Sequence, residues 1–424
     1  MSSVFLTRIV SVIQWTAFTS LLIFAPLARG GTSRWALSVS LWLVLLASTA
    51  MILKRMWQGK RLLPRSHLEI PVALLLLITA VSWFLSIYRG ATTWALLRFV
   101  LYIGVFYLAV EATESRSQTR WLLIAILGMG TLLSFIGFIK YLGGTVPAYW
   151  VFPETGQHRL TSTFVTPNYL AGYLEMVFIL GLGFILCRPS KTTIIWVSCL
   201  FLILMSILLS MSRGAMLATV SALIFMGILF FLEKGVSKTK VILAGSALLL
   251  IITLTFLGSG YMIKRLEFLR NPHSSLSTRL SVWQGSIQLI TENPVLGTGL
   301  GTFPWSFPTV RPAGLKLRYR EAENDYIQLV TETGIIGLLP IMWGIYLVFK
   351  VGIQRFSQTN SRFRAGVTLG ALCGVIAMLI HSIVDYNVQI TSNGILFSVL
   401  VGLVMGSATS KQSSRQSREI LQIN

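Results

Sequence analysis

The feature that most constrains the fold of this chain is a series of long apolar runs that recurs along its whole length. Each run has about 17 residues or more, which is enough to cross a bilayer core of roughly 30 Å as an α-helix. Because backbone groups inside lipid must satisfy their own hydrogen bonds, we expect these runs to be helices. A transmembrane β-barrel would instead show alternating segments of about ten residues, and the sequence lacks them. The predicted fold class is therefore an all-α polytopic membrane protein.

We predict about twelve membrane spans and one long, partly helical periplasmic loop. The spans lie near residues 9–28, 35–53, 69–88, 92–111, 121–142, 164–187, 193–211, 214–232, 241–258, 335–350, 365–387 and 392–407. This pattern divides the chain into helices 1–9 over 1–258, the loop over 259–334, helices 10–12 over 335–410 and a tail over 411–424. The first span lacks a small-residue cleavage site, so we interpret it as a retained anchor.

The distribution of lysine and arginine predicts the orientation. With the N-terminus in the cytoplasm, most of the 35 basic residues fall in inner segments, as the positive-inside rule requires. Both termini are then cytoplasmic and the long loop faces away from the cytoplasm, which suits a cell with an inner membrane and an outer, periplasmic compartment. The net charge of +21 is explained by this topology and does not indicate nucleic-acid binding, because the basic residues are dispersed among short loops. The three cysteines form no C-x-x-C pair and indicate neither disulfides nor a metal site.

The long loop contains a predicted surface helix. The stretch "STRLSVWQGSIQLITENPVLGTGLGTF" starts with a serine and places Leu280, Trp283, Ile287 and Ile290 at helical spacing before a turn rich in glycine. We interpret it as an amphipathic helix lying on or near the membrane face. Held against the spans, this part of the loop would cover a cavity open to the outer leaflet.

Acidic residues are concentrated at one place, in "EAENDYIQLVTETGIIG". The chain has 14 acidic residues, and Glu321, Glu323, Asp325 and Glu332 all belong to this stretch. It follows a basic run formed by Arg311, Lys316, Arg318 and Arg320. The acidic residues could balance that run, and the run could be a solvated face or a contact with anionic lipid. Alternatively, a carboxylate here serves chemistry.

Four stretches of the sequence resemble the O-antigen ligase and polymerase family. They are "RLTSTFVTPNYLAGYLEM", "SRGAML", "RLSVWQGSIQLITENPVLGTGLGTF" and "ENDYIQLVTETGIIG", and their order around one long outer loop is similar to the order in the family. The resemblance implies an integral membrane glycosyltransferase with a glycan donor linked to undecaprenyl diphosphate. It also implies a glycolipid or glycan acceptor, such as lipid A-core in lipopolysaccharide biosynthesis.

This chain departs from the loop motif of the family at one position. The motif is His, then Asn, Ser or Gln, nine residues, Gly, two residues and Gly, and this chain has Asn324, Gly334 and Gly337 in the same frame. Glu323 occupies the position of the His, which in the family is thought to activate the acceptor hydroxyl. A glutamate could act as this base if burial raises its pKa. Asn324 and Tyr326 would position substrate or the loop.

The resemblance also implies arginines that hold the diphosphate of the donor. They are Arg213 in "SRGAML" and Arg279 in "STRLSVW". Apart from the resemblance, Arg159 is a third candidate for contact with phosphate or sugar, and Arg318 and Arg320 are further candidate substrate contacts. Arginine pairs bidentately with phosphate oxygens and remains charged. Arg213 could instead reach the membrane interface, and Arg279 could be a solvated charge on the surface helix. With no cluster of metal-ligand spacing in the sequence, we predict a metal-independent, inverting transfer without a cofactor.

A second base candidate is His381, which lies near the outer end of the eleventh predicted span. Asp385 is four residues further on, so the two would share a helix face, and the carboxylate could orient the imidazole. Alternatively, such a pair would only lock helix packing. Arg98, in the middle of the fourth predicted span, should be paired or lie near an aqueous cavity, with Glu175 as a candidate partner.

The sequence leaves the exact activity open. A ligase transfers the glycan to an acceptor lipid, and a polymerase transfers it to another repeat unit on the same carrier, and the motifs do not separate these two. A transporter of a solute or a lipid-linked sugar is a less favoured alternative. Transporters commonly show internal repeats, whereas the long loop here has no counterpart in the first half of the chain.

Overall fold

The computed structural model describes residues 3–152, 158–187, 193–234, 275–312, 315 and 319–406, and these ranges contain helices but no strand. The longer helices are α1 (Ser3–Leu27), α2 (Arg34–Trp57), α3 (Glu69–Leu85), α4 (Arg89–Ala112), α5 (Arg116–Tyr141), α6 (Pro167–Cys187), α7 (Thr193–Leu209), α8 (Arg213–Lys234), α11 (Ser275–Glu292), α13 (Asp325–Gln358), α14 (Arg362–His381) and α15 (Thr391–Gly406). The short ones are η1 (Arg29–Gly31), η2 (Ala148–Trp150), α12 (Phe303–Ser306) and η3 (Phe307–Thr309).

The all-α membrane fold is confirmed. In the described part of the chain, eight helices are long and apolar enough to cross a membrane, namely α1, α2, α4, α5, α6, α8, α13 and α14. The shorter apolar helices α3, α7 and α15 coincide with three further predicted spans. The predicted span at 241–258 and the tail at 411–424 lie outside the described residues. The total of twelve spans therefore stays a prediction.

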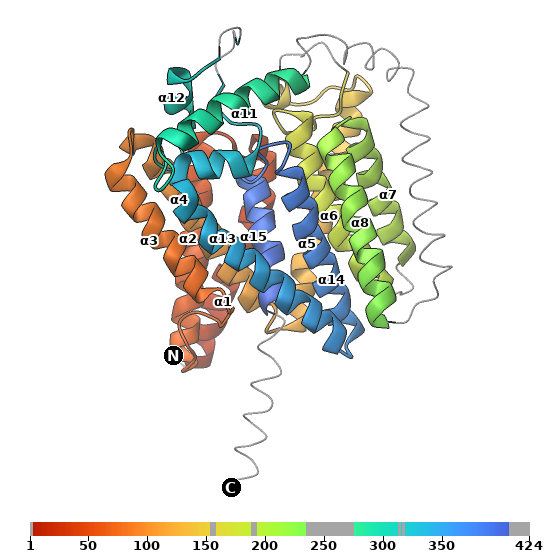
Figure 1. Ribbon diagram of the computed structural model, residues 1–424. Helices are drawn as coiled ribbons and strands as arrows, with labels where there is room; N and C mark the ends of the chain where they lie inside the picture. Colours follow the sequence, from red (N-terminus) through yellow and green to blue (C-terminus); the bar gives the residue numbers. More distant parts are fainter. Residues whose placement is uncertain are drawn as a thin grey trace.

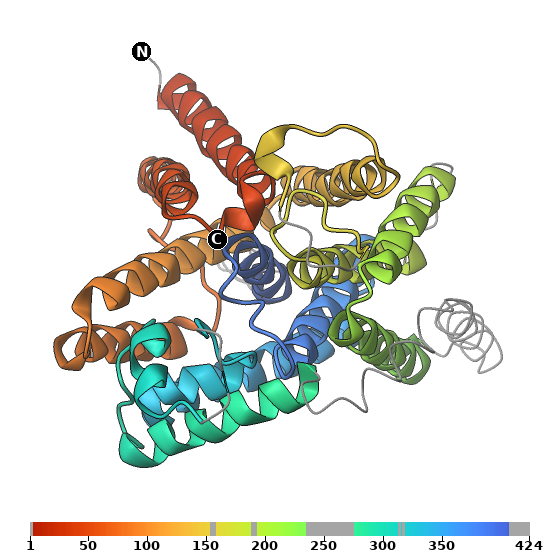
Figure 2. The same ribbon diagram turned by 90° about the horizontal axis from the view of Figure 1, so that it is seen from above.

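The helices form a bundle that is covered at one end. α11 and α12 lie across this end, whereas α1 begins and α15 ends at the opposite one (Figure 1). Seen from above, α11 runs alongside α13 (Figure 2). The described part of the predicted periplasmic loop thus lies at the end of the bundle away from the start of α1 and the end of α15. The direction of the bundle in the membrane remains a prediction.

The predicted surface helix is confirmed as α11, although its buried face differs from the predicted one. Val282 and Leu289 are buried and pack in a small core with Phe303 and Phe307. Leu280 and Ile287, two members of the predicted apolar stripe, are instead exposed. The loop therefore has a hydrophobic core of its own, and an apolar edge of α11 remains on the outside.

Helix α13 is broken at Gly334, which is the first glycine of the loop motif. Its φ of 64° lies in the left-handed region, which is costly for a residue with a Cβ. The turn after α11 supplies hydrogen-bond partners around the break. The amides of Thr298 and Gly299 donate to carbonyls of α13 at 3.0 and 2.9 Å, and the Ile335 amide donates to the Pro294 carbonyl at 3.0 Å. The break thus joins the loop to the bundle.

Close packing of α6 against α14 fixes the position of the candidate site. Gly366, Gly370 and Gly374 are spaced four residues apart on α14, so they lie on one face. A Cβ on Gly370 would lie 2.4 Å from the carbonyl oxygen of Leu180 on α6. The two backbones can approach this closely only with small residues between them. As a result, the polar ends of α6 and α14 are held side by side.

At the opposite end of the bundle, two basic residues in the last turn of α2 are paired with acids. Lys54 contacts Glu111 at 2.7 Å, and Arg55 contacts Glu114 at 2.8 Å. Lys54, Arg55 and Glu111 are buried. Because an unpaired buried charge is costly, these contacts fix α2 against α4 at this end.

Candidate active site

Asn324 and Tyr326 fix the segment at the start of α13. Asn324 caps the helix, because its side-chain oxygen accepts the backbone N–H groups of Tyr326 and Ile327 at 2.9 and 3.0 Å. Its amide nitrogen donates to the Ile383 carbonyl at 2.7 Å, and the Tyr326 hydroxyl donates to the Leu379 carbonyl at 2.8 Å. Two of the predicted substrate-binding residues therefore hold the loop against the end of α14.

Glu323 faces α11. Its carboxylate contacts the Arg279 guanidinium at 3.2 Å, and the two side chains are 29% and 26% exposed. Burial raises the pKa of the Glu323 carboxyl, and the nearby charge of Asp385 raises it further, whereas Arg279 lowers it. Glu323 also has a φ of 55°, an uncommon conformation for a residue with a side chain. Such strain is often found at functional sites.

Asp385 links this ion pair to α6. One carboxylate oxygen accepts a hydrogen bond from the Asn168 amide at 2.8 Å and lies 3.8 Å from the Arg279 guanidinium. The side-chain oxygen of Asn168 accepts from Arg159 at 2.7 Å. A continuous series of polar contacts thus connects Arg159, Asn168, Asp385, Arg279 and Glu323, and we call these five residues the arginine–carboxylate cluster.

Arg213 begins α8 at the same end of the bundle. The turn that precedes it contacts the cluster, because Arg159 donates to the Ser210 carbonyl at 2.7 Å. The Arg213 side chain is exposed. Its neighbour Gly214 packs against the His381 ring, since a Cβ on Gly214 would lie 2.8 Å from Nε2 of that ring. The turn before Arg213 therefore contacts the cluster, and no hydrogen bond or ion pair of the Arg213 side chain is seen within the described part of the chain.

The predicted pairing of His381 with Asp385 is wrong. α14 ends at His381, so Asp385 is not one helical turn further along the same helix. The His381 Nδ1 lies 3.1 Å from both carboxylate oxygens of Glu175, and both side chains are completely buried. Glu175 was the candidate partner of Arg98, and this pairing is also not seen. The His381 imidazole is enclosed between α6, α8 and α14.

Glu321, Asp325 and Glu332, the remaining acidic residues of the stretch, form no ion pair with the basic run in the described part of the loop. Gln328 donates to Glu321 at 2.7 Å and to Glu332 at 3.1 Å. Asp325 accepts from the Ser382 hydroxyl at 2.8 Å. Arg311 and Arg320 are exposed, and neither is part of an ion pair in this part of the structure. Lys316 and Arg318 lie outside the described residues.

The sequence analysis did not assign Asn168 and Asp385 to a cluster with the arginines. Asn168 lies in "TPNYL", within a stretch that was singled out for another reason, and Asp385 was considered only as the partner of His381. A usable signal existed for Asp385, because it is one of only two aspartates in the chain. Among the described residues, no group of three His, Cys, Asp or Glu side chains is arranged to hold a metal ion.

Comparison with known proteins agrees with the resemblance in the motifs. No curated protein matches the chain. Residues 197–342 match the family model described as O-antigen ligase, a region that runs from α7 through α8 and α11 into α13 and includes Arg213, Arg279 and Glu323. The chain is therefore a multi-pass membrane protein with a region, residues 197–342, that is similar to the O-antigen ligase family.

Proposed function

We propose that this protein transfers a glycan from a polyprenyl-diphosphate-linked donor, undecaprenyl diphosphate in bacteria, to an acceptor hydroxyl at the periplasmic face of the inner membrane. The observation that carries the proposal is the arginine–carboxylate cluster at the end of the bundle that α11 covers. It combines cations suited to a diphosphate with a carboxylate suited to a hydroxyl. A ligase and a polymerase would use the same cluster, so the proposal covers both activities.

In this mechanism the arginines hold the leaving group. Arg279, Arg159 and Arg213 would contact the diphosphate, whose negative charge grows as the bond between the anomeric carbon and the phosphate oxygen breaks. Cations that are already in place where charge develops lower the barrier. Arginine remains protonated throughout, so it takes no proton from the reaction.

Glu323 is the proposed base. Its carboxylate would accept the proton of the acceptor hydroxyl while the acceptor oxygen bonds to the anomeric carbon from the side opposite the leaving diphosphate. One bond forms and one breaks in this single displacement, so the anomeric configuration inverts. The raised pKa of the Glu323 carboxyl makes it a stronger base than an ordinary glutamate. His381 is the less favoured base, because its side chain is fully buried and contacts Glu175.

The ion pair between Arg279 and Glu323 supports a link between donor binding and base strength. A bound diphosphate would compete with Glu323 for the Arg279 guanidinium. Since Arg279 lowers the pKa of the Glu323 carboxyl, its movement towards phosphate would raise that pKa and strengthen the base. Donor binding would thereby prepare the site for the acceptor.

The direct test uses purified protein, undecaprenyl-diphosphate-linked glycan and a candidate acceptor lipid in detergent, with EDTA present. Transfer without a sealed compartment would separate an enzyme from a transporter. Arg279→Ala should lose transfer, whereas Arg311→Ala, an exposed arginine outside the cluster, should keep it. Equal transfer by both variants would overturn the diphosphate role of Arg279.

A further inference from the structure

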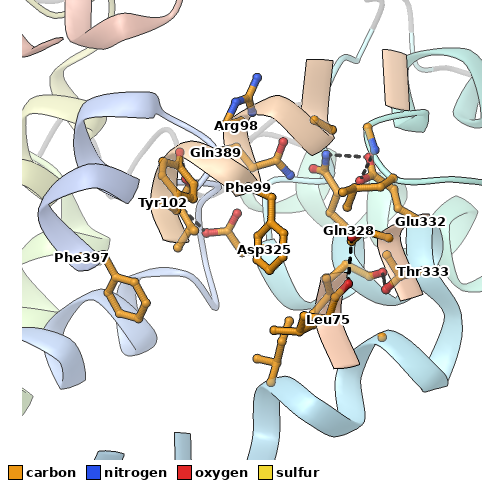
Figure 3. Close-up of a pocket in the computed structure, with 18 of the residues that line it drawn as sticks. Leu75, Arg98, Phe99, Tyr102, Asp325, Gln328, Glu332, Thr333, Gln389 and Phe397 are labelled. Carbon is orange, nitrogen blue, oxygen red and sulfur yellow. Dashed lines mark hydrogen bonds between the residues drawn. The ribbon is translucent and has the colours of Figure 1, made fainter. Parts of the chain in front are cut away.

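A second polar region lies on the other side of the segment that holds Glu323. A cavity of about 570 Å³ is enclosed mainly by α3, α4, α13 and α15, and its lining includes Arg98, Glu321, Asp325 and Glu332. Figure 3 shows Arg98 and Glu332 approaching this cavity from different helices. A volume of this size is typical of ligand sites. We call it the Arg98 cavity.

The Arg98 guanidinium is not fully satisfied by protein groups. Its Nε is buried and has no hydrogen-bond partner among the described residues. A buried donor without a partner is costly, and more so when it belongs to a charged group. The cavity is therefore suited to a ligand that brings a hydrogen-bond acceptor to Arg98.

The other polar groups favour a ligand with hydroxyls over one with phosphates. Glu332 is held by the backbone N–H groups of Gly301 and Phe303 at 2.7 and 3.2 Å, and Gln328 bridges Glu332 and Glu321. Carboxyl groups and amides can exchange hydrogen bonds with sugar hydroxyls, whereas a diphosphate would face the acidic groups of Glu321, Asp325 and Glu332. Burial raises the pKa of the Glu321 carboxyl to about 8, so this group can also donate at neutral pH.

The rest of the Arg98 cavity is apolar and elongated. Its lining follows α13 from Glu332 to Val348, a length of about 24 Å at 1.5 Å per residue. Leu75 on α3, Ile345 on α13 and Phe397 on α15 belong to this part. A hydrocarbon chain could lie along it, with a sugar at the polar end. The cavity therefore has the chemistry of a site for a glycolipid.

The position of Glu323 connects this cavity to the arginine–carboxylate cluster. Glu321 and Asp325 line the cavity, whereas Glu323, between them in the sequence, contacts Arg279 in the cluster. We propose that the Arg98 cavity binds the acceptor, as a glycolipid whose chain lies along α13 and whose sugar lies between Arg98 and Glu332. The donor diphosphate then occupies the cationic cluster, and the two substrates meet at Glu323. This inference rests on the proposed function.

Photo-crosslinking of the full chain in lipid nanodiscs tests this assignment. The probe is dodecyl maltoside with a diazirine in its alkyl chain, and labelled peptides are identified by mass spectrometry. We expect labelling on α3 and α13 around Leu75 and Ile345, which unlabelled dodecyl maltoside displaces and dodecyl phosphate does not. Displacement by dodecyl phosphate at equal concentration would overturn the preference for a sugar.

A pair of matched glycine substitutions places the ligand. Gly344 lines the cavity, and a Cβ there would meet only Pro71, at 3.9 Å, so Gly344→Phe should fill the cavity without disturbing the backbone. Gly128 on α5 has no atom within 4 Å of a Cβ and lies outside the cavity, so Gly128→Phe is the control. Labelling should be lost in Gly344→Phe only. Equal labelling of both variants, each eluting as folded protein on size exclusion, would overturn the site.

Two further variants separate this inference from the proposed function. Arg98→Gln should weaken displacement by dodecyl maltoside by about tenfold or more, because a hydrogen bond to a charged donor is worth roughly 1.5–3 kcal/mol. Unchanged displacement would contradict the role of Arg98. Glu323→Ala should keep the labelling while losing transfer. If wild-type protein is labelled as described but transfers no glycan, the proposed function fails and the binding site remains.

Discussion

Arg279 on α11 and Glu323 in the turn before α13 form an ion pair at 3.2 Å, although 44 residues separate them in the sequence. The pair joins the helix that covers the bundle to the segment at which the Arg98 cavity and the arginine–carboxylate cluster meet. Both side chains are about one quarter exposed, so a substrate can reach them. Their contact brings a candidate base and a candidate phosphate ligand to one place, and the first prediction follows from it.

Glu323→Gln should lower glycan transfer by about 10²–10⁴-fold, which is the usual contribution of a general base. The amide keeps the size of the side chain but cannot take up the acceptor proton. Transfer is measured with purified protein, and donor binding is measured separately. Glu292→Gln is the matched control, because Glu292 is an exposed acid on α11 outside the cluster. A Glu323→Gln variant with normal transfer would show that Glu323 only balances the charge of Arg279.

The pH dependence of transfer should report the environment of Glu323. The base acts when it is deprotonated, so kcat/KM should rise with pH through the pKa of the Glu323 carboxyl, which lies above its ordinary value of 4.5. Asp385 contributes to this increase. Asp385→Asn removes that negative charge, so the rise of kcat/KM should move to lower pH. A pH profile that is unchanged in Asp385→Asn, or that moves to higher pH, would contradict the role of Glu323 as the base.

The pairing of Arg279 with Glu323 could not be predicted from the sequence, whereas the helices that carry these residues could. Apolar runs long enough for a bilayer predict helices directly. The spacing of apolar residues also predicts a helix at α11, although α11 begins at Ser275, before the serine taken as its start, and buries a different face. The contact itself depends on the break at Gly334 and on the turn that packs against it. Such contacts arise from tertiary packing, which periodicity does not encode.

The partner of His381 was also not predictable from the sequence. The predicted span at 365–387 continues past both residues and would place Asp385 on the same helix face. In the structure α14 ends at His381, and the partner is Glu175, which is 206 residues away in the sequence. The glycines of α14 allow α6 to approach closely enough for this contact. The helix end decided the pairing, and helix ends are the least certain part of a sequence-based prediction.

Glu321 predicts a pH dependence of stability. Its pKa is about 8 in the folded protein and ordinarily 4.5, so the folded state binds more protons than the unfolded state between these values. The free energy of unfolding should therefore fall as the pH rises from about 4.5 to about 8. Glu321→Gln should remove part of this fall and give a higher Tm than wild type at pH 8.5. The measurement is thermal unfolding in detergent at several pH values, and identical pH profiles for the two proteins would contradict the prediction.

Gly334→Ala should destabilise the protein by about 1–3 kcal/mol or more, because the backbone there has a left-handed φ that costs a residue with a Cβ. A Cβ would also lie 2.1 Å from the Val295 carbonyl oxygen, in the turn that packs on the break. The control is Gly128→Ala, at a helical position with open space, which should be neutral or stabilising by about 0.5–1 kcal/mol. The measurement is the Tm of both variants by thermal unfolding. An unchanged Tm for Gly334→Ala would show that the break is not required.

His381→Ala should lower stability and leave the chemistry of the folded fraction largely intact. His381 is completely buried against Glu175, and breaking a buried pair by removing one partner costs about 3–5 kcal/mol. A double-mutant cycle with Glu175→Ala should therefore show strong coupling in the free energy of unfolding, and transfer per folded molecule should remain well above that of Glu323→Gln. The opposite pattern, with an unchanged Tm and lost transfer, would make His381 the base. Glu323 would then serve only to hold Arg279 in place.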